Sequence, residues 1–147
     1  MPRIFDVAII GAGPAGSASA IALARSGYAV ALIDKQIFPR EKLCGDFVNP
    51  INWPIFRDLG VEERLLAQPH TRVTGFRITS YCGARAAATF SQVNQNRSFG
   101  LGLRRAQLDH VLLQRAEETG VTIRTGQRVR QISKPSRQWQ LDMGAGE

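Results

Sequence analysis

Three glycines near the start of the chain have the spacing of a dinucleotide-binding loop. Gly11, Gly13 and Gly16 form the pattern Gly-x-Gly-x-x-Gly. The first allows a tight turn from a strand into a helix, the second lets the backbone approach a pyrophosphate, and the third lets the helix pack close to the strand. A helix N-terminus offers free N–H groups and a partial positive charge to phosphate oxygens. We therefore expect a phosphate site here, with Pro14 and Ala15 contributing backbone contacts.

A carboxylate follows this loop at the spacing expected for ribose recognition. Asp34 comes directly after an apolar run that ends at Ile33. A carboxylate at the end of the second strand can accept hydrogen bonds from both hydroxyls of an adenosine ribose, and it would repel the 2′-phosphate of NADP. We include the adjacent Lys35 among the expected cofactor contacts. These residues suit the ADP half of either NAD or FAD, so the rest of the chain must choose between the two.

The segments around the loop predict a strand, a helix and a second strand. Residues 4–10 form an apolar run of strand length, and residues 14–26 form an alanine-rich helix with a proline at an early position, where its missing N–H costs nothing. Gly27 suits the helix end because it tolerates a positive φ. Residues 28–33 form the second strand. We expect a parallel pair, buried on both faces, with a right-handed crossover.

The remainder of the chain predicts short helices and antiparallel hairpins added to this core. The fold class is therefore α/β, with a Rossmann-like FAD-binding or NAD-binding βαβ core. We expect loops at 34–49 and 91–100, short helices at 51–59 and 62–67, a hairpin of 73–80 with 84–90, an amphipathic helix at 106–119, a strand at 121–125, and a hairpin of 128–133 with 138–143.

Length and composition restrict the classes of function. The 147 residues, 44% of them hydrophobic, predict one domain over 1–147 with a packed core. The two cysteines, Cys44 and Cys82, predict neither a disulfide framework nor a metal site, and they fit a cytoplasmic setting. The apolar segment near the start is interrupted too often for a membrane-spanning helix. The net charge of +7 comes from scattered arginines without a basic run, so nucleic-acid binding is not expected.

Two later segments carry a family resemblance. They are Phe-Pro-Arg-Glu-Lys-Leu-Cys-Gly-Asp at 38–46 and Leu-Arg-Arg-Ala-Gln-Leu-Asp at 103–109. Together with the glycine loop, and in this order, they resemble the p-hydroxybenzoate hydroxylase-like flavoprotein superfamily. The Pro-Arg-x-Lys-x-Cys-Gly stretch is most similar to its geranylgeranyl reductase-like branch. The resemblance covers nearly the whole chain and implies that the cofactor is FAD and that the function is that of an oxidoreductase or monooxygenase.

The resemblance also implies further cofactor contacts. Arg105, four residues before Asp109, matches an arginine that lies beside the flavin cofactor in the family. A cation at a helix N-terminus is disfavoured by roughly 0.3–1 kcal/mol, so two adjacent arginines there suggest a nearby anion. Arg40 and Lys42 match positions along the cofactor, and Gly45 matches a close backbone approach to the flavin ring. We favour a packing role for Cys44 over a role beside the flavin.

FAD would carry the chemistry, and the protein would position and tune it. The resemblance implies two reaction types, oxygen transfer to a small aromatic substrate and hydride delivery to a carbon–carbon double bond of an isoprenoid-like one. NAD(P)H is the expected electron donor. No residue of the sequence is identified as a catalytic acid or base, and the oligomeric state is not predicted.

The sequence departs from the family at its C-terminal end. Full members continue into a substrate domain and a second flavin motif containing Gly-Asp, whereas the Gly-Asp of this chain, Gly45-Asp46, belongs to the early loop. We expect an incomplete FAD-binding domain that is weakly active or inactive alone. Two alternatives stay open. One is an NAD-dependent dehydrogenase domain, which requires a regular βαβαβ continuation after Asp34. The other is a non-catalytic nucleotide-binding module or remnant.

Overall fold

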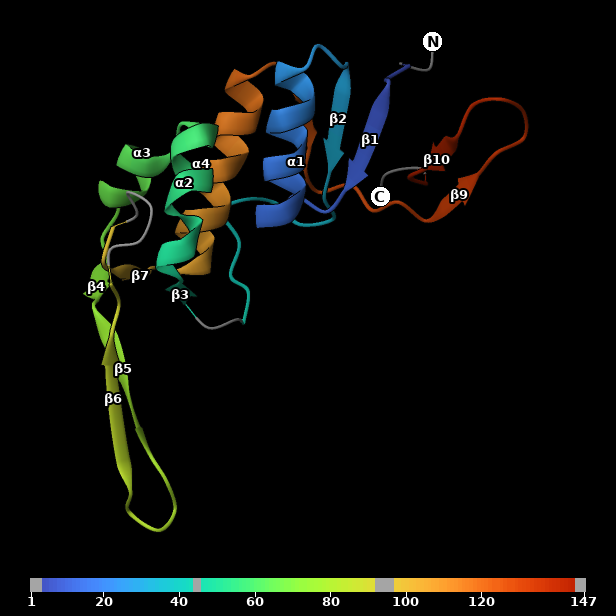
Figure 1. Cartoon of the computed structure of the whole chain (residues 1–147). Helices are drawn as coiled ribbons and strands as arrows, with labels where there is room; N and C mark the ends of the chain where they lie inside the picture. Colours follow the sequence, from blue (N-terminus) through green and yellow to red (C-terminus); the bar gives the residue numbers. More distant parts are fainter. Residues whose placement is uncertain (1–3, 44–45, 92–96, 145–147) are drawn as a thin grey trace. The chain divides into compact units, whose positions relative to one another are not determined.

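The structure, a computed structural model, describes residues 4–43, 46–91 and 97–144. The chain divides into two units by its internal contacts (Figure 1). Unit 1 comprises residues 1–41 and 109–147, and unit 2 comprises residues 42–108. Each unit is described separately below.

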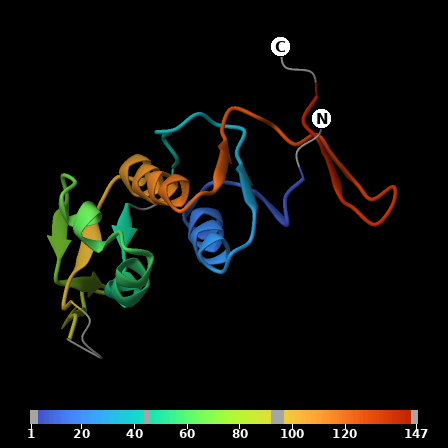
Figure 2. The same ribbon diagram turned by 90° about the horizontal axis from the view of Figure 1, so that it is seen from above.

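Unit 1 is built on the predicted strand–helix–strand. Strand β1 (Val7–Ile10) leads through the glycine loop into helix α1 (Pro14–Arg25), and strand β2 (Val30–Ile33) follows. The two strands are parallel, with Val7 opposite Val30. Helix α1 lies beside them (Figures 1 and 2). The α/β fold class and the βαβ unit are therefore confirmed, with each strand shorter than its apolar run.

A third parallel strand completes this sheet. Strand β8 (Thr122–Arg124) pairs with β2 on the side away from β1, so the strand order is β1-β2-β8. All four residues of β2 are buried, as expected for a central strand. The expectation that β1 is buried on both faces is wrong, because Ala8 and Ile10 are exposed. Strand β1 is an edge strand of this sheet and has a neighbouring strand on one side only within the described residues.

The helix meets the first strand at a contact that only glycine permits. A Cβ atom added to Gly16 would collide with the carbonyl oxygen of Gly11 and would lie 3.4 Å from the side chain of Ile9. Gly11 itself has a φ of +105°, which favours glycine. Both glycines are therefore required by backbone geometry, whatever binds at the loop.

Helix α4 (Arg105–Glu118) belongs to unit 2 at its first residues and to unit 1 from Asp109 onwards. Its predicted apolar stripe is confirmed, since Leu108, Val111, Leu112 and Ala116 are all buried. Gly120, with a φ of +89°, follows the helix and leads into β8, as the sequence predicts.

The last element of unit 1 is a small antiparallel hairpin. Strands β9 (Gln131–Ser133) and β10 (Gln140–Asp142) pair with Leu141 opposite Ile132, which confirms the predicted hairpin. The hairpin extends away from the parallel strands in both views (Figures 1 and 2). Trp139 beside it is 66% exposed, and the Lys134 ammonium lies 5.2 Å from the centre of its ring.

Unit 2 contains a sheet that the sequence did not predict. Strands β3 (Phe47–Val48), β7 (Gly100–Gly102) and β4 (Thr71–Val73) form an antiparallel sheet in the order β3-β7-β4. The predicted loop at 34–49 is therefore wrong near its end, because Phe47 and Val48 form β3. The predicted loop at 91–100 is wrong at its last residue, because Gly100 is the first residue of β7. These strands have only two or three residues and pair with segments far away in sequence, so they carry no readable alternation.

The rest of unit 2 agrees with the sequence more closely. A 3-10 helix at Pro50–Asn52 precedes α2 (Trp53–Leu59), and α3 (Glu62–Leu66) follows. Strands β5 (Gly75–Thr79) and β6 (Arg85–Thr89) form the predicted hairpin, an extended two-stranded ribbon (Figure 1). Its side chains are almost all exposed, including Phe76 and Ile78.

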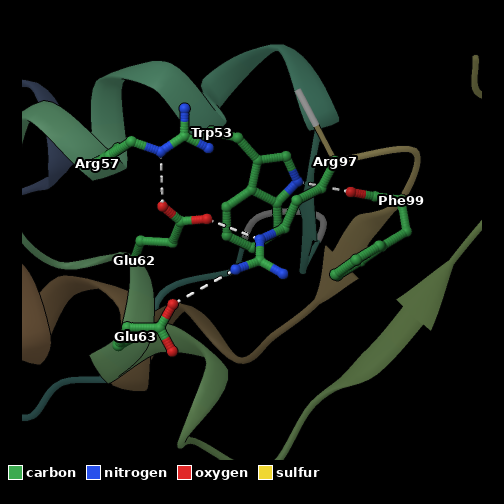
Figure 3. Close-up of polar contacts among 6 residues, drawn as sticks. All are labelled: Trp53, Arg57, Glu62, Glu63, Arg97 and Phe99. Carbon is green, nitrogen blue, oxygen red and sulfur yellow. Dashed lines mark hydrogen bonds and ion pairs between the residues drawn. The ribbon is translucent and has the colours of Figure 1, made fainter. Parts of the chain in front are cut away.

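A network of charged and aromatic side chains holds α2, α3 and the start of β7 together (Figure 3). The buried carboxylate of Glu62 accepts hydrogen bonds from Arg57 Nε at 3.0 Å and from Arg97 Nε at 2.6 Å. The fully buried Trp53 donates its indole N–H to the carbonyl oxygen of Phe99 at 2.7 Å. The Arg97 guanidinium lies 5.5 Å from the centre of the Trp53 ring.

This network determines the ionisation of Glu62. Burial raises the pKa of Glu62, but the hydrogen bonds and charges of Arg97 and Arg57 outweigh that effect, so the pKa lies below its ordinary value. The carboxylate is thus more stable as an ion in the folded chain than in the unfolded one. Its contribution to stability is fully present above the unfolded pKa of about 4.3 and is lost as the pH falls through the folded pKa.

We expect Gly16→Ala to destabilise unit 1 by roughly 3 kcal/mol, the upper end of overpacking costs, because the new Cβ meets backbone rather than a flexible side chain. The measurement is urea unfolding followed by circular dichroism. The matched control is Gly13→Ala, whose Cβ would meet only Arg40 Nη2 at an ordinary 3.6 Å. Equal stability of the two variants would contradict the close contact at Gly16.

We expect Glu62→Gln to lower the free energy of unfolding by about 1–3 kcal/mol at neutral pH, because it removes a charged hydrogen-bond acceptor from two arginines. The loss should shrink as the pH falls below about 4. Trp53 fluorescence during urea unfolding reports it directly in a Trp139→Phe background, since the sequence has two tryptophans.

The control for this variant is Glu63→Gln. Glu63 has an 83% exposed side chain that lies 3.3 Å from Arg97, so its loss should cost less than about 1 kcal/mol. A Glu62→Gln effect that stays constant down to pH 3 would show that the carboxylate charge is not what stabilises the network.

Candidate nucleotide-binding site

The glycine loop is fixed to the end of the neighbouring strand by two backbone donors. Gly11 N–H donates to the carbonyl oxygen of Ile33 at 2.7 Å, and Ala12 N–H donates to Asp34 Oδ2 at 2.8 Å. The first bond continues the β1–β2 ladder into the loop. The second joins the loop to the side chain that the sequence assigns to ribose. The loop and the acid therefore form one rigid unit before any ligand binds.

Asp34 is buried, with 8% of its surface exposed. Its Oδ1 accepts a hydrogen bond from Gln36 N–H at 2.9 Å, in addition to the bond from Ala12. Each carboxylate oxygen has about two lone-pair sites, so both oxygens retain capacity for a hydroxyl donor. The residue thus combines a structural role, which the sequence did not predict, with a position at the end of β2 that suits ribose.

The N-terminus of α1 opens at Gly13. This N-cap residue is in an extended conformation, and no side chain of the described residues caps the first turn by a hydrogen bond. Pro14 occupies the start of the helix, where it needs no acceptor. The first N–H groups of a helix have no partner within the helix itself, and the helix dipole makes this end partly positive. These features suit an anion.

Arg40 lies beside this opening. Its Nη2 is the atom nearest to the position that a Cβ on Gly13 would occupy, at 3.6 Å. The guanidinium lies 4.9 Å from the centre of the Phe38 ring, and the side chain is 12% exposed. Its Nε is buried and has no hydrogen-bond partner among the residues that the structure describes. The cation is therefore ordered next to the loop and keeps one donor unused.

The partner of this arginine is Asp109, in helix α4. Asp109 is fully buried, and its Oδ2 lies 3.4 Å from Arg40 Nη2. Asp109 is not among the cofactor contacts that the sequence predicts. Its isolation as an acid on an apolar helix face, between Leu108 and Val111, is the signal that could have identified it.

The other residues that the sequence predicts as cofactor contacts are Lys35, Lys42, Gly45 and Arg105. Lys35, the residue directly after Asp34, is exposed. Lys42 and Arg105 belong to unit 2, where Arg105 begins α4 and its backbone N–H donates to Asp46 Oδ1 at 3.1 Å. Gly45 and Cys44 fall outside the described residues. The structure thus places Arg40 near Gly13, whereas the contacts of Lys42 and Arg105 with the cofactor stay predictions.

The described residues contain neither a cluster of metal-binding side chains nor a helix that could cross a membrane. Across 4–43, 46–91 and 97–144, no group of three or more histidine, cysteine, aspartate or glutamate side chains could hold a metal ion. Within the same ranges, no helix is both long and apolar enough to cross a membrane.

The chain matches the family model described as FAD binding domain over residues 5–139. It is 36% identical over 121 residues to a menaquinone reductase of Mycobacterium tuberculosis, which covers 82% of this chain and 29% of that protein. It is 32% identical over 133 residues to a flavin-dependent halogenase of Armillaria mellea, covering 90% of this chain and 25% of that one.

Solved structures give the same result. The myxobacterial chondrochloren halogenase CndH, an FAD-dependent halogenase, superposes with a TM-score of 0.81 and 26% identity over 90% of this chain and 31% of its own. A flavoprotein/dehydrogenase from Cytophaga hutchinsonii superposes with a TM-score of 0.77 and 27% identity, over 87% of this chain and 32% of its own. The chain spans about a quarter to a third of the length of these relatives.

The family model covers far more than half of the residues, and the fold, the glycine loop and the buried acid agree with it. The chain therefore belongs to the FAD binding domain family of p-hydroxybenzoate hydroxylase-like flavoproteins.

Proposed function

We propose that unit 1 binds the ADP half of FAD. The observation that carries the proposal is the open N-terminus of α1 at Gly13, with the buried Asp34 on one side and the Arg40 guanidinium on the other. The diphosphate would lie at the first turn of α1, against Gly11, Gly13, Ala15 and Gly16. The ribose hydroxyls would donate to Asp34. The backbone leaves room there, since even a Cβ at Gly13 would make no close contact.

The charge of this site favours a bound anion. The positive end of α1 and the guanidinium of Arg40 are adjacent, and the buried Nε of Arg40 lacks an acceptor in the described part of the chain. A diphosphate would supply acceptors to both. Lys35, Lys42, Gly45 and Arg105 stay proposed contacts with other parts of the cofactor.

The NAD-dependent dehydrogenase alternative has less support. It requires a regular βαβαβ continuation after Asp34, whereas the next parallel partner of β2 begins only at Thr122. The intervening residues form the antiparallel strands and short helices of unit 2. The family model is also that of an FAD binding domain.

We propose further that the whole protein is an FAD-dependent oxidoreductase. When bound, FAD supplies the redox chemistry, and the residues described above bind and orient it. Relatives named as a menaquinone reductase and as flavin-dependent halogenases match most of this chain, and the FAD binding domain model covers residues 5–139, which supports the assignment of FAD to this segment. The geranylgeranyl reductase-like branch, the NAD(P)H donor and an aromatic or isoprenoid-like substrate stay predictions. A non-catalytic nucleotide-binding module stays the second candidate.

We expect the purified chain to bind FAD, measured by the visible absorption bands of bound flavin after titration and removal of free cofactor. A chain that remains colourless after incubation with FAD, yet binds NADH, would overturn the proposal. Bound FAD without any turnover with NADH or NADPH would favour the non-catalytic module for this length of chain.

We expect Gly13→Ala to weaken FAD binding by about tenfold or more, because a displaced diphosphate loses at least one charged hydrogen bond of roughly 1.5 kcal/mol. The measurement is a fluorescence titration with FAD. The fold should be unaffected, since the added Cβ makes only an ordinary contact. The control is Ser19→Ala, a change of an exposed residue on the same helix. Equal affinity of the two variants would place the diphosphate elsewhere.

A further inference from the structure

Two sequence segments that are far apart meet in one ion pair. Arg40 comes from the loop after β2, and Asp109 comes from helix α4, yet Nη2 and Oδ2 lie 3.4 Å apart. Both residues belong to unit 1. Asp109 is fully buried and the Arg40 side chain is nearly so. A buried carboxylate of this kind requires charged or hydrogen-bonding partners, and Arg40 is one of them.

The same guanidinium nitrogen borders the phosphate loop. Nη2 of Arg40 is the atom nearest to the vacant Cβ position of Gly13, so the atom that pairs with Asp109 also faces the first turn of α1. The ring of Phe38 lies beside the guanidinium at 4.9 Å. A planar guanidinium held by a carboxylate and an aromatic ring has little freedom to turn.

The pairing also explains how a cation is tolerated at this place. The N-terminus of a helix is partly positive, so a neighbouring arginine is disfavoured unless an anion is near. The carboxylate of Asp109 supplies that anion when no ligand is bound. The buried Nε of Arg40 has no acceptor within residues 4–43, 46–91 and 97–144. The cation is therefore held in position without using all of its hydrogen-bonding capacity.

We propose that Asp109 is a positioning residue whose carboxylate holds the Arg40 guanidinium beside Gly13, where that guanidinium meets the diphosphate of the cofactor. This inference rests on the proposed binding of FAD. The change in FAD affinity on removal of the Asp109 carboxylate distinguishes this role from a purely electrostatic one, because the two roles predict changes in opposite directions. If Asp109 acted on a diphosphate only through its charge, its removal would strengthen binding. If it acts by holding Arg40, its removal weakens binding although a negative charge is lost.

The test is a double-mutant cycle on FAD affinity. The four proteins are the wild type, Asp109→Asn, Arg40→Ala and the variant with both changes. We expect each single change to weaken FAD binding by about tenfold, the effect of one charged hydrogen bond. Because Asp109 acts through Arg40, Asp109→Asn should have no further effect in the Arg40→Ala background.

The matched control is Asp142→Asn, which removes the same charge from an exposed side chain of unit 1 that accepts a hydrogen bond from Gly144 N–H. It should leave FAD affinity unchanged. Wild-type or tighter binding by Asp109→Asn, or a full further loss in the Arg40→Ala background, would overturn the proposal.

A second variant covers the case in which Asp109→Asn fails to fold. Asp109→Glu keeps the charge and moves the carboxylate by one methylene. We expect it to weaken FAD binding in the wild-type background and to have no effect in the Arg40→Ala background. An Asp109→Glu chain that binds FAD as the wild type does would show that the position of the carboxylate does not matter.

A measurement without cofactor separates this inference from the proposed function. The Nε–H proton of Arg40, identified in a ¹⁵N correlation spectrum by its loss in Arg40→Ala, should exchange slowly in the wild type because Nε is buried. It should exchange rapidly in Asp109→Glu. Equal exchange rates would overturn the positioning role even if FAD binds. A wild-type chain that binds no FAD would overturn the proposed function while leaving this difference in exchange intact.

Discussion

The close approach of α1 to β1 at Gly16 is the constraint on which the rest of unit 1 depends. Because Gly16 has no Cβ, the helix lies against the carbonyl oxygen of Gly11, and its N-terminus begins immediately beyond the end of β1. That placement lets Ala12 N–H reach the carboxylate of Asp34 on the neighbouring strand. The phosphate loop, the ribose acid and the positive helix end are thus arranged by one packing contact and one hydrogen bond.

Most parts of the fold that the sequence predicts have local partners or a periodicity readable in their own residues. The βαβ unit, the β5–β6 hairpin and the β9–β10 hairpin join neighbouring segments, and α4 shows its apolar stripe in its own sequence. Strand β8 is the exception, because its apolar residues after Gly120 predict it although its partner β2 is far away in sequence. The β3-β7-β4 sheet was missed because its strands have two or three residues and β7 pairs with two segments far away in sequence. A strand of that length is determined by its partners, not by its own composition.

The same distinction applies to the site. Residue type and spacing were enough to predict a nucleotide site at Gly11, Gly13, Gly16 and Asp34, and the structure brings these residues together at the ends of β1 and β2. Type and spacing were not enough to show that Asp34 also fixes the loop through Ala12, or that Asp109 pairs with Arg40. Both contacts join positions that only the folded chain brings together. The excess of arginine alone gave no guide, because Arg57 and Arg97 pair with Glu62 inside unit 2. The family segment at 38–46 is what distinguished Arg40 from them in the sequence.

That comparison shows how a buried cation can be assigned to structure or to ligand. In unit 2, Arg57 and Arg97 both donate to one carboxylate, Glu62, which is held as an ion by them, and the network stabilises the packing of α2 and α3. In unit 1, Arg40 is more deeply buried than either of these arginines, yet its Nε has no acceptor among the described residues and its Nη2 borders an open helix N-terminus. A protein rarely leaves a buried donor unpaired without a reason. A buried donor without a described acceptor, beside an open helix N-terminus, supports the proposed diphosphate contact, whereas two arginines that share one carboxylate form a structural ion pair.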